Sequence, residues 1–507
     1  MTGEKTREKS APLPREATGI PGMDDILNGG LPARRLYLVQ GHPGAGKTTF
    51  ALQFLLEGAR RGQSGLYITL SETKEELNAV AASHDWDLSP IALQELSAAE
   101  TTLDAVAQNT LFYPAEVELG ETVRLVLAEI DRVSPTRVVF DSLSELRMLS
   151  QSPLRFRRQI LALKQYLAAR HATVLMLEDV SVDAGDLQLQ SLAHGVIALE
   201  QNAPMYGTDR RRLRVVKLRG SRYLGGYHDF RIETGGIEAF PRLVSGDFPR
   251  TETLPKIASG MPDLDSLLGG GLDFGTSALL LGPAGSGKTV FATKYAYEGA
   301  IQGHKPAFFL FEEGLSTFYI RSKSLGMDLA PLVDRGDVFV QHIDPAELMP
   351  GELVERIRNL VENEGVRTVV LDSVNGYLNA MLEENFLVPQ MHELLNYLRR
   401  RGVLTILVMA QHGFVGTHMN SPVDVSYLAD TVVLLRYFES GGRLLKAISV
   451  VKKRIGGHET SIREYAIEAN RLRVGKPLTE FRGLLSGIPT FTGKEEKLFG
   501  STDDPGR

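Results

Sequence analysis

The chain contains no cysteine and a single tryptophan among its 507 residues. The absence of cysteine excludes disulfides, thiolate zinc sites, iron–sulfur clusters and cysteine nucleophiles, and it is compatible with a reducing compartment. No run of about 18 apolar residues occurs, so we expect no membrane span. The N-terminal stretch MTGEKTREKSAPLPREATG is charged and has no apolar core, so it predicts neither a secretory signal nor a membrane anchor. We therefore expect a cytoplasmic protein with no membrane partner.

An excess of charge of one sign is also lacking. Lys plus Arg total 56 against 62 Asp plus Glu, which gives a formal net charge of -6 at pH 7. This balance offers no global electrostatic reason to expect nucleic acid as a partner. With 43% hydrophobic residues, the chain is long enough for two or three soluble globular domains.

What the chain does contain is one long internal repeat. GIPGMDDILNGGL at residue 19 aligns without a gap with GMPDLDSLLGGGL at residue 260, and GHPGAGKTTF at 41 aligns with GPAGSGKTVF at 282. At a shorter offset, RVVFDSL at 137 faces TVVLDSV at 368. A period this long indicates two complete domains rather than a solenoid.

Strand and helix patterns alternate within each copy. Short aliphatic runs such as RLYLVQ, RVVFD and TVLMLE lie between longer helical patterns in the first copy. The corresponding runs in the second copy are SALLLG, TVVLD and LTILVMA. Continuous apolar strands between amphipathic helices predict an α/β fold, with a mostly parallel sheet covered by helices on both faces. The predicted organisation is a disordered N-terminal segment 1–16, a first domain 17–245, a linker 246–258, a second domain 259–490 and a short flexible tail 491–507.

Each copy carries a loop of the form G-x-x-x-x-G-K-[ST]. Backbone N–H groups of such a loop turn toward phosphate oxygens, its lysine neutralises the β- and γ-phosphates, and its hydroxyl reaches Mg²⁺. A glycine-rich turn without a ligand is the alternative. The predicted nucleotide-binding residues are Gly41, Gly44, Gly46, Lys47, Thr48 and Thr49 in the first copy, and Gly282, Gly285, Gly287, Lys288, Thr289 and Val290 in the second.

Carboxylates follow the apolar strands of both copies. Asp141 and Asp372 end RVVF and TVVL, where a nucleotide-binding domain places a second Mg²⁺-organising group beside Thr48 and Thr289. Glu72, Glu312 and Glu313 also end strands, and there they could take a proton from water or a hydroxyl. Ser71 stands where the second copy has Glu312. The alternative is a solvated strand end, since turns also favour acidic residues.

A basic stretch closes the first copy. RRRLRVVKLRGSR, from 210 to 222, holds seven basic residues and no acid, and VVKKRIGG repeats its Lys-x-Arg pattern. Strand alternation puts each lysine and arginine of that pattern on one face. They could reach the γ-phosphate of a neighbouring subunit, track a nucleic-acid backbone, or form a solvated strand. The recurrence in both copies favours the first interpretation for Lys217, Arg219, Lys452 and Arg454.

Together, the tandem GGGL segments, the two phosphate loops, the strand-end EE, the DS pairs and KLRG resemble the KaiC family from about residue 17 to 490. The resemblance implies two tandem RecA-like P-loop domains in a double-ring homohexamer, with ATP and Mg²⁺ between subunits. It implies a slow ATPase in the first domain and a second domain that phosphorylates and dephosphorylates its own hydroxyls. Glu72 matches the first site, and Glu312 and Glu313 match the second, with Glu313 also a metal-ligand candidate; the four basic residues match trans-acting positions.

The family's adjacent phosphoacceptors fall on Ser426 and Tyr427 in DVSYLADT, and Ser421 lies near a further hydroxyl position. Tyr427 departs from the family threonine, and Ser71 leaves the first site with one candidate base. The tail after LLSGIP is shorter than the one expected to bind a KaiA-like activator, which argues against that partner. AEVELGET is also short, and a KaiB-like partner is left open.

The resulting hypothesis is a KaiC-like ATPase and serine autokinase and autophosphatase that acts as a hexameric timing or signalling device. Two alternatives stay open. An ATP-assembled signalling scaffold would form no phosphoserine. A RecA-like motor would show nucleic-acid-stimulated, salt-sensitive ATPase activity.

Overall fold

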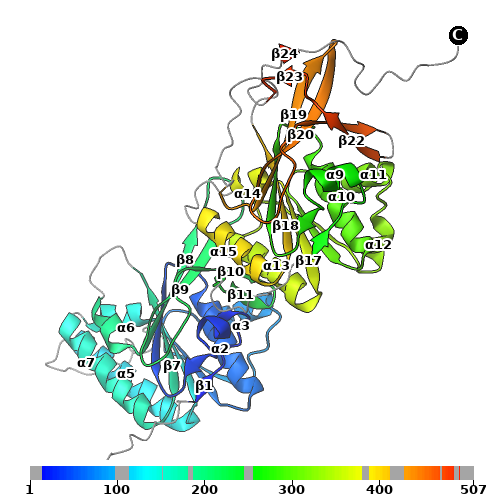
Figure 1. Cartoon of the computed structure of the whole chain (residues 1–507). Coiled ribbons are helices and arrows are strands. Elements are labelled where there is room, and N and C mark those ends of the chain that lie inside the picture. The colour runs from blue at the N-terminus through cyan, green and yellow to red at the C-terminus, as the bar shows by residue number, and fades with distance from the viewer. Residues whose placement is uncertain are drawn as a thin grey trace, which may run out of the picture. The chain divides into compact units, whose positions relative to one another are not determined.

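The structure is a computed structural model of the chain, and it describes residues 14–96, 114–150, 152–180, 187–244, 255–379, 387–411, 427–468, 471–484 and 490–491. The chain divides into two compact units, residues 1–242 and 243–507, and each unit holds one copy of the repeat (Figure 1). Among the described residues, none of the helices combines the length and the apolar character that crossing a bilayer requires.

The first unit alternates strands and helices up to its last four strands. Its elements are β1 (Arg15–Glu16), α1 (Met23–Ile26), β2 (Leu31–Pro32), β3 (Leu36–Gly41), α2 (Lys47–Arg60), β4 (Gly65–Thr69), α3 (Lys74–Ser83), β5 (Ile91–Glu95), α5 (Pro114–Val133), β6 (Arg137–Asp141), α6 (Leu143–Ser150), α7 (Pro153–Ala169), β7 (Thr173–Asp179), α8 (Leu187–Leu192), β8 (Gly195–Asn202), β9 (Arg210–Leu218), β10 (His228–Glu233) and β11 (Gly236–Phe240).

The main sheet of this unit has the order β11-β10-β9-β8-β3-β7-β6-β4-β5. Strands from β8 to β5 in this order pair in parallel, and β8 to β11 pair antiparallel. Helices α2 and α3 pack on one face, and α5, α6 and α7 cover the other (Figure 1). Because both faces are covered, β3 and β6 are buried at every position, which explains their continuous apolar sequences.

The second unit repeats this plan. Its elements are β12 (Lys256–Ile257), α9 (Pro262–Leu267), β13 (Leu272–Asp273), β14 (Ser277–Gly282), α10 (Lys288–Ile301), β15 (Lys305–Leu310), α11 (Leu315–Ser324), α12 (Ala330–Asp334), β16 (Phe339–His342), α13 (Pro350–Asn363), β17 (Val366–Asp372), α14 (Val374–Asn379), α15 (Leu387–Arg400), β18 (Leu404–Ala410), β19 (Thr431–Ser440), β20 (Arg443–Lys453), β21 (Arg463–Glu468), β22 (Arg471–Pro477), β23 (Phe481–Arg482) and β24 (Thr490–Phe491).

The second main sheet has the order β16-β15-β17-β18-β14-β19-β20-β21-β22, with the same change from parallel to antiparallel pairing. The central strand of each sheet, β3 or β14, leads directly into a phosphate loop, and the neighbouring parallel strands end at the same edge. The predicted α/β fold with two mostly parallel, helix-covered sheets is therefore confirmed.

Two short strands lie where the sequence predicts irregular structure. Strand β1 falls within the predicted N-terminal segment 1–16 and pairs with β2, and β12 falls within the predicted linker and pairs with β13. Arg137 explains the first case, because this fully buried side chain donates to the Glu16 carboxylate at 2.9 Å and to the Ala17 carbonyl at 2.9 Å. A two-residue strand is too short for any periodicity to reveal it.

Helix α2 makes room for that buried arginine. A Cβ atom on Gly58 would lie 2.5 Å from Cδ of Arg137, so only glycine fits at this point of the helix. In the second unit, a Cβ atom on Gly299 of α10 would lie 2.8 Å from Cδ1 of Ile257. The same hole in the helix surface is thus filled by a guanidinium stem in one unit and by an isoleucine in the other.

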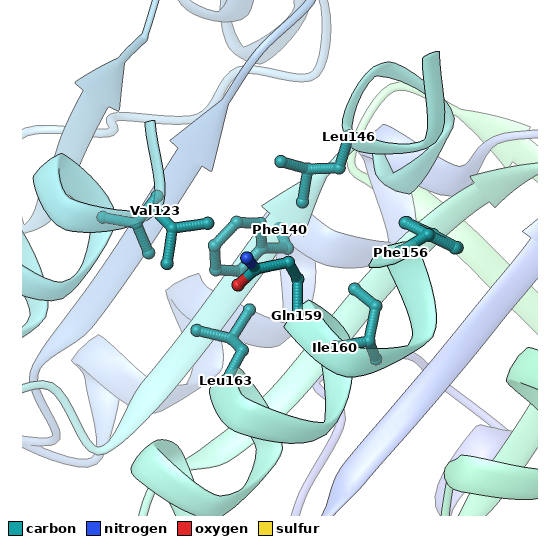
Figure 2. Close-up of a pocket in the computed structure, with 8 residues that line it drawn as sticks. Val123, Phe140, Leu146, Phe156, Gln159, Ile160 and Leu163 are labelled. Carbon is teal, nitrogen blue, oxygen red and sulfur yellow. The ribbon is translucent and has the colours of Figure 1, made fainter. Parts of the chain in front are cut away.

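The first unit also contains a small apolar cavity between β6 and the helices α5, α6 and α7 (Figure 2). Phe140, Leu146 and Leu163 point into it, and its volume is about 10 Å³. A volume of roughly one water molecule excludes a small-molecule ligand, and we interpret the cavity as a packing gap.

Candidate nucleotide-binding sites

Glycines with positive φ form both phosphate loops. Gly46 and Gly287 precede the first residues of α2 and α10 with φ of +97° and +105°. A Cβ atom there would lie 2.6 Å from Cδ1 of Ile232 or 2.7 Å from Cδ1 of Ile467, so the close approach also requires glycine. Gly44 and Gly285 also have positive φ, Gly41 and Gly282 end the preceding strands, and Thr49 and Val290 are buried in the helices. Each loop therefore directs a helix N-terminus at an anion position.

The loop lysines occupy equivalent positions. Lys47 Nζ donates to the carbonyls of Gly41 and His42, both at 3.0 Å. Lys288 Nζ donates to Gly282 at 2.9 Å and Pro283 at 2.8 Å. Both lysines are buried, so each ammonium is held inside its loop where phosphate oxygens would arrive.

In the first unit, Asp141 lies at the end of β6 beside the loop hydroxyl. Its Oδ2 accepts a hydrogen bond of 2.5 Å from the Tyr67 hydroxyl and one of 3.5 Å from Thr48. Burial raises the pKa of Asp141, while the Tyr67 hydrogen bond and the charge of Lys47 lower it. Strands β3, β4 and β6 thus bring a lysine, a hydroxyl and a carboxylate together, as the strand-end pattern predicts.

Glu72 joins this group from the end of β4. Within the described residues, its Oε2 is buried and has no hydrogen-bond partner. Burial raises the pKa of Glu72 to about 7, and repulsion by Asp141 adds to the effect while Lys47 opposes it. A carboxyl group with a pKa near neutrality and an unused oxygen is suited to accept a proton.

The second unit arranges its acids differently. Asp372 accepts a hydrogen bond from Thr289, and burial raises its pKa to about 6. Oε1 of Glu312 accepts a 2.6 Å hydrogen bond from Ser373. Glu313, the counterpart of Glu72, instead contacts Arg321 Nη1 with both carboxylate oxygens at 2.6 Å. The glutamates of this site are therefore both oriented by partners.

The four basic residues lie at equivalent places in the two units. Lys217 donates to the Gln190 carbonyl and Arg219 to that of Ser191 at 2.8 Å. In the second unit, Lys452 donates to Ala429 at 2.8 Å and Arg454 to Tyr427 at 2.9 Å. These carbonyls all belong to the segment that precedes β8 or β19. The lysine and arginine of the Lys-x-Arg pattern therefore make equivalent contacts in the two units.

The predicted phosphoacceptors Ser426 and Ser421 lie outside the described residues. Tyr427 is described, and 54% of it is exposed. Its backbone carbonyl is held by Arg454, whose Nη1 also lies 3.4 Å from Asp430 Oδ1. The tyrosine is thus accessible beside one of the predicted trans-acting arginines.

Mg²⁺ fits both sites only together with phosphate. No group of three or more His, Asp or Glu residues that could hold a metal occurs in the part of the chain that the structure describes. Mg²⁺ typically uses one or two carboxylates plus substrate phosphates. Each site supplies one such carboxylate beside a threonine hydroxyl: the pair lies 3.5 Å apart in the first site, and the second site has the equivalent hydrogen-bonded pair. Thr48 with Asp141 and Thr289 with Asp372 would hold the ion, and Glu313 would do so only by sharing its oxygens with Arg321.

Some site residues escaped the sequence analysis. Asp179, at the end of β7, forms a 2.6 Å ion pair with Lys47. The strand-end rule applied to TVLMLED could have found it, because β7 is the parallel neighbour of β3. Tyr67 donates to Asp141 by a side-chain hydrogen bond that no motif indicates. Ser373, the serine of the second DS pair, donates to Glu312, a contact that the motif alone does not reveal.

A sequence model described as the KaiC ATPase domain matches residues 16–244 and again residues 257–479. The chain belongs to the KaiC family. It is 26% identical over 497 residues to the circadian clock oscillator protein KaiC of Thermostichus vulcanus, covering 97% of this chain and 95% of that protein. It is 25% identical over 499 residues to the circadian clock protein KaiC3 of Synechocystis sp. strain PCC 6803, covering 96% and 97%.

Membership of the KaiC family agrees with the two loops and sheets described above. The units are tandem RecA-like ATPase domains, and the chain is a KaiC-like ATP-binding protein. At about a quarter identity, the relatives leave the particular reaction of each site to be argued from its residues.

Proposed function

We propose that the two ATP sites perform different chemistry: the first hydrolyses ATP slowly, and the second transfers the γ-phosphate to Ser426. The observation that carries this proposal is the different setting of the strand-end glutamates. Glu72 is half-buried with an unused oxygen and a raised pKa, whereas Glu312 is exposed and oriented by Ser373. An exposed, oriented carboxylate suits a bulky hydroxyl acceptor, and a recessed one suits water.

In the first site, Lys47 binds the β- and γ-phosphates and the loop N–H groups orient them. Glu72 accepts a proton from the attacking water, and Asp141 with Thr48 would hold Mg²⁺. The ion, when bound, neutralises charge on the phosphates. One candidate base and no second glutamate at position 71 are consistent with slow turnover.

In the second site, Lys288 binds the phosphates and Glu312 takes the proton from the Ser426 hydroxyl as its oxygen attacks phosphorus. The bond between the γ-phosphorus and the bridging oxygen breaks, and ADP leaves. Lys452 and Arg454 of a neighbouring subunit neutralise charge on the transferring group, as Lys217 and Arg219 do in the first ring. Dephosphorylation at the same site completes a timing or signalling cycle.

We propose that ATP lies between the subunits of a homohexamer in the cytoplasm. A KaiB-like protein is the partner left open. The formal charge of -6 argues against nucleic acid.

Site-resolved phosphopeptide mass spectrometry after incubation with Mg-ATP tests the proposal. We expect phosphate on Ser426 in the wild type and none in Lys288→Ala. Glu312→Gln should lose at least 100-fold of the transfer rate and still bind ATP, because general base catalysis contributes about 10²–10⁴. Glu439→Gln, which changes an exposed glutamate at the end of β19, is the matched control and should be phosphorylated normally.

Two results would contradict this assignment. Retained phosphorylation in Glu312→Gln overturns the base. ATP hydrolysis with Ser426 and Tyr427 unmodified in the wild type overturns the autokinase in favour of an ATP-assembled scaffold, and nucleic-acid stimulation of that hydrolysis favours a motor.

A further inference from the structure

Asp179 lies at the phosphate loop of the first domain, at the end of β7. Residues Gly41 and Asp179 are partners in the parallel pairing of β3 with β7, so the carboxylate stands beside the start of the loop. Asp179 Oδ1 lies 2.6 Å from Lys47 Nζ. The lysine side chain is 9% exposed and the aspartate 42%. An accessible carboxylate therefore caps a buried lysine at the place where phosphate would bind.

The described residues of the second domain place no carboxylate at the equivalent position. The same pairing between β14 and β18 puts Ala410 opposite Gly282. Within the described part of the chain, Lys288 Nζ forms no ion pair and is held by two carbonyls alone. Burial lowers the pKa of Lys288 to about 8, the direction expected when an ammonium lacks a close counter-charge. The two loops thus differ by one carboxylate at one position.

That carboxylate competes for the contact that a nucleotide needs. The loop lysine neutralises the β- and γ-phosphates, so a bound nucleotide must share or displace the ion pair. Repulsion between Asp179 and a phosphate falls with distance, and the γ-phosphate adds charge that ADP lacks. Asp141 and Glu72 lie in the same site, so Asp179 brings a third carboxylate to the single ammonium of the loop.

We propose that Asp179 competes with the γ-phosphate for Lys47 and thereby lowers the preference of the first site for ATP over ADP. The proposal rests on nucleotide binding at the first loop and is independent of autokinase activity. Because Asp179 weakens the binding of ATP more than that of ADP, the first domain retains its ADP product. This retention adds a reason for slow turnover. At limiting ATP, the second domain fills first.

Equilibrium titration of the full chain with fluorescent mant-ATP and mant-ADP in the presence of Mg²⁺ tests this. Lys288→Ala abolishes nucleotide binding at the second site. In that background, the Asp179→Asn variant is compared with the protein that retains Asp179. We expect Asp179→Asn to tighten mant-ATP binding about tenfold and mant-ADP binding no more than about threefold. Asp179→Ser should do the same, which separates lost charge from hydrogen bonding by the new amide.

The reciprocal change provides the matched control. In a Lys47→Ala background, which silences the first site, Ala410→Asp should weaken mant-ATP binding at the second site about tenfold and mant-ADP binding less. The midpoint of unfolding followed by the single tryptophan should stay unchanged in the Asp179 variants.

The outcomes separate this inference from the function on which it rests. Unchanged or weaker ATP binding in both Asp179 variants overturns the inference and makes Asp179 a phosphate- or metal-positioning group. A double variant, Lys47→Ala with Lys288→Ala, should bind neither nucleotide. Binding by that variant contradicts nucleotide binding at the loops themselves, whatever Asp179 does.

Discussion

The two domains share a sheet order, a phosphate loop and a strand-end aspartate. Yet an ion-paired side chain fills the space beside the helix glycine in one domain, and an apolar side chain fills it in the other. In the first, the buried Arg137 pairs with Glu16 and donates to Gln63 at 2.8 Å and to the Phe54 carbonyl at 2.6 Å. In the second, the aligned positions are Ile257, which belongs to an apolar core cluster, and Thr368, which is buried. A duplicated backbone therefore does not dictate whether its interior is ionic or apolar.

The nucleotide sites diverge in the same way. Tyr67 donates to Asp141 in the first domain, but its counterpart Phe308 has no hydroxyl. Arg321 pairs with Glu313 in the second domain, whereas the first has Val80 at the position aligned with Arg321. The first site thus concentrates negative charge, and the second neutralises it. Three predictions test these differences between the two domains.

Removing the buried arginine should have the largest effect. Arg137→Met leaves Glu16 without its ion-pair partner, and breaking a buried pair costs about 3–5 kcal/mol. We expect the free energy of unfolding of the first domain to fall by that amount. Urea titration followed by the fluorescence of Trp86, which packs against the core of this domain, measures it selectively.

Two controls sharpen this prediction. Thr368→Val in the second domain should change stability by less than about 1 kcal/mol, because Thr368 Oγ1 has no hydrogen-bond partner within the described residues. Adding Glu16→Ile to Arg137→Met should recover much of the loss, since an apolar replacement of a buried pair is often neutral. An unaltered Trp86 transition in Arg137→Met would show that the pair contributes nothing.

The next largest expected effect is the change of ATP hydrolysis in the first site with pH. Burial raises the pKa of Glu72 to about 7, and only the ionised form accepts a proton. In a Lys288→Ala background, kcat/KM for ATP hydrolysis should therefore fall about tenfold per unit below pH 7 and level off above it. In the same background, Glu72→Gln should lose about 100-fold and the pH dependence with it. A flat profile from pH 5.5 to 8 with Glu72 intact in that background would exclude Glu72 as the base.

The smallest effect concerns Glu313. Arg321→Met frees both carboxylate oxygens, so if Glu313 is a metal ligand, the Mg²⁺ concentration for half-maximal ATP binding should fall about threefold. Lys47→Ala in the background restricts the measurement to the second site, and Arg321→Lys should keep the wild-type value. A higher Mg²⁺ requirement in Arg321→Met would instead make Glu313 a group that Arg321 positions for another purpose.

Much of this architecture could be predicted from the sequence, because buried parallel strands and glycine loops leave strong local signals. The strands before Gly41 and Gly282 and the aspartates after RVVF and TVVL are examples. No motif marks Asp179 or Arg321, because the ion pair of Asp179 depends on strand pairing and that of Arg321 on a helix that returns to the site. Nor does any motif mark the buried Arg137, since a lone arginine at the start of an apolar strand resembles a solvated strand end.

Gly58 and Gly299 carry a consequence for how the two halves could be recombined. Each glycine leaves space at the same position of its helix, and the side chain that fills it comes from a distant part of the same domain: Arg137 in one case and Ile257 in the other. A chimera that receives the helix of the other half keeps this space and should tolerate the graft. A chimera that receives only the arginine gains a charge without its acceptors, and one that receives only the isoleucine in place of Glu16 leaves Arg137 without its ion-pair partner. The space beside the helix glycine is therefore a feature that both copies retain from the duplication. The residues that fill it have diverged, and they must be exchanged as a set.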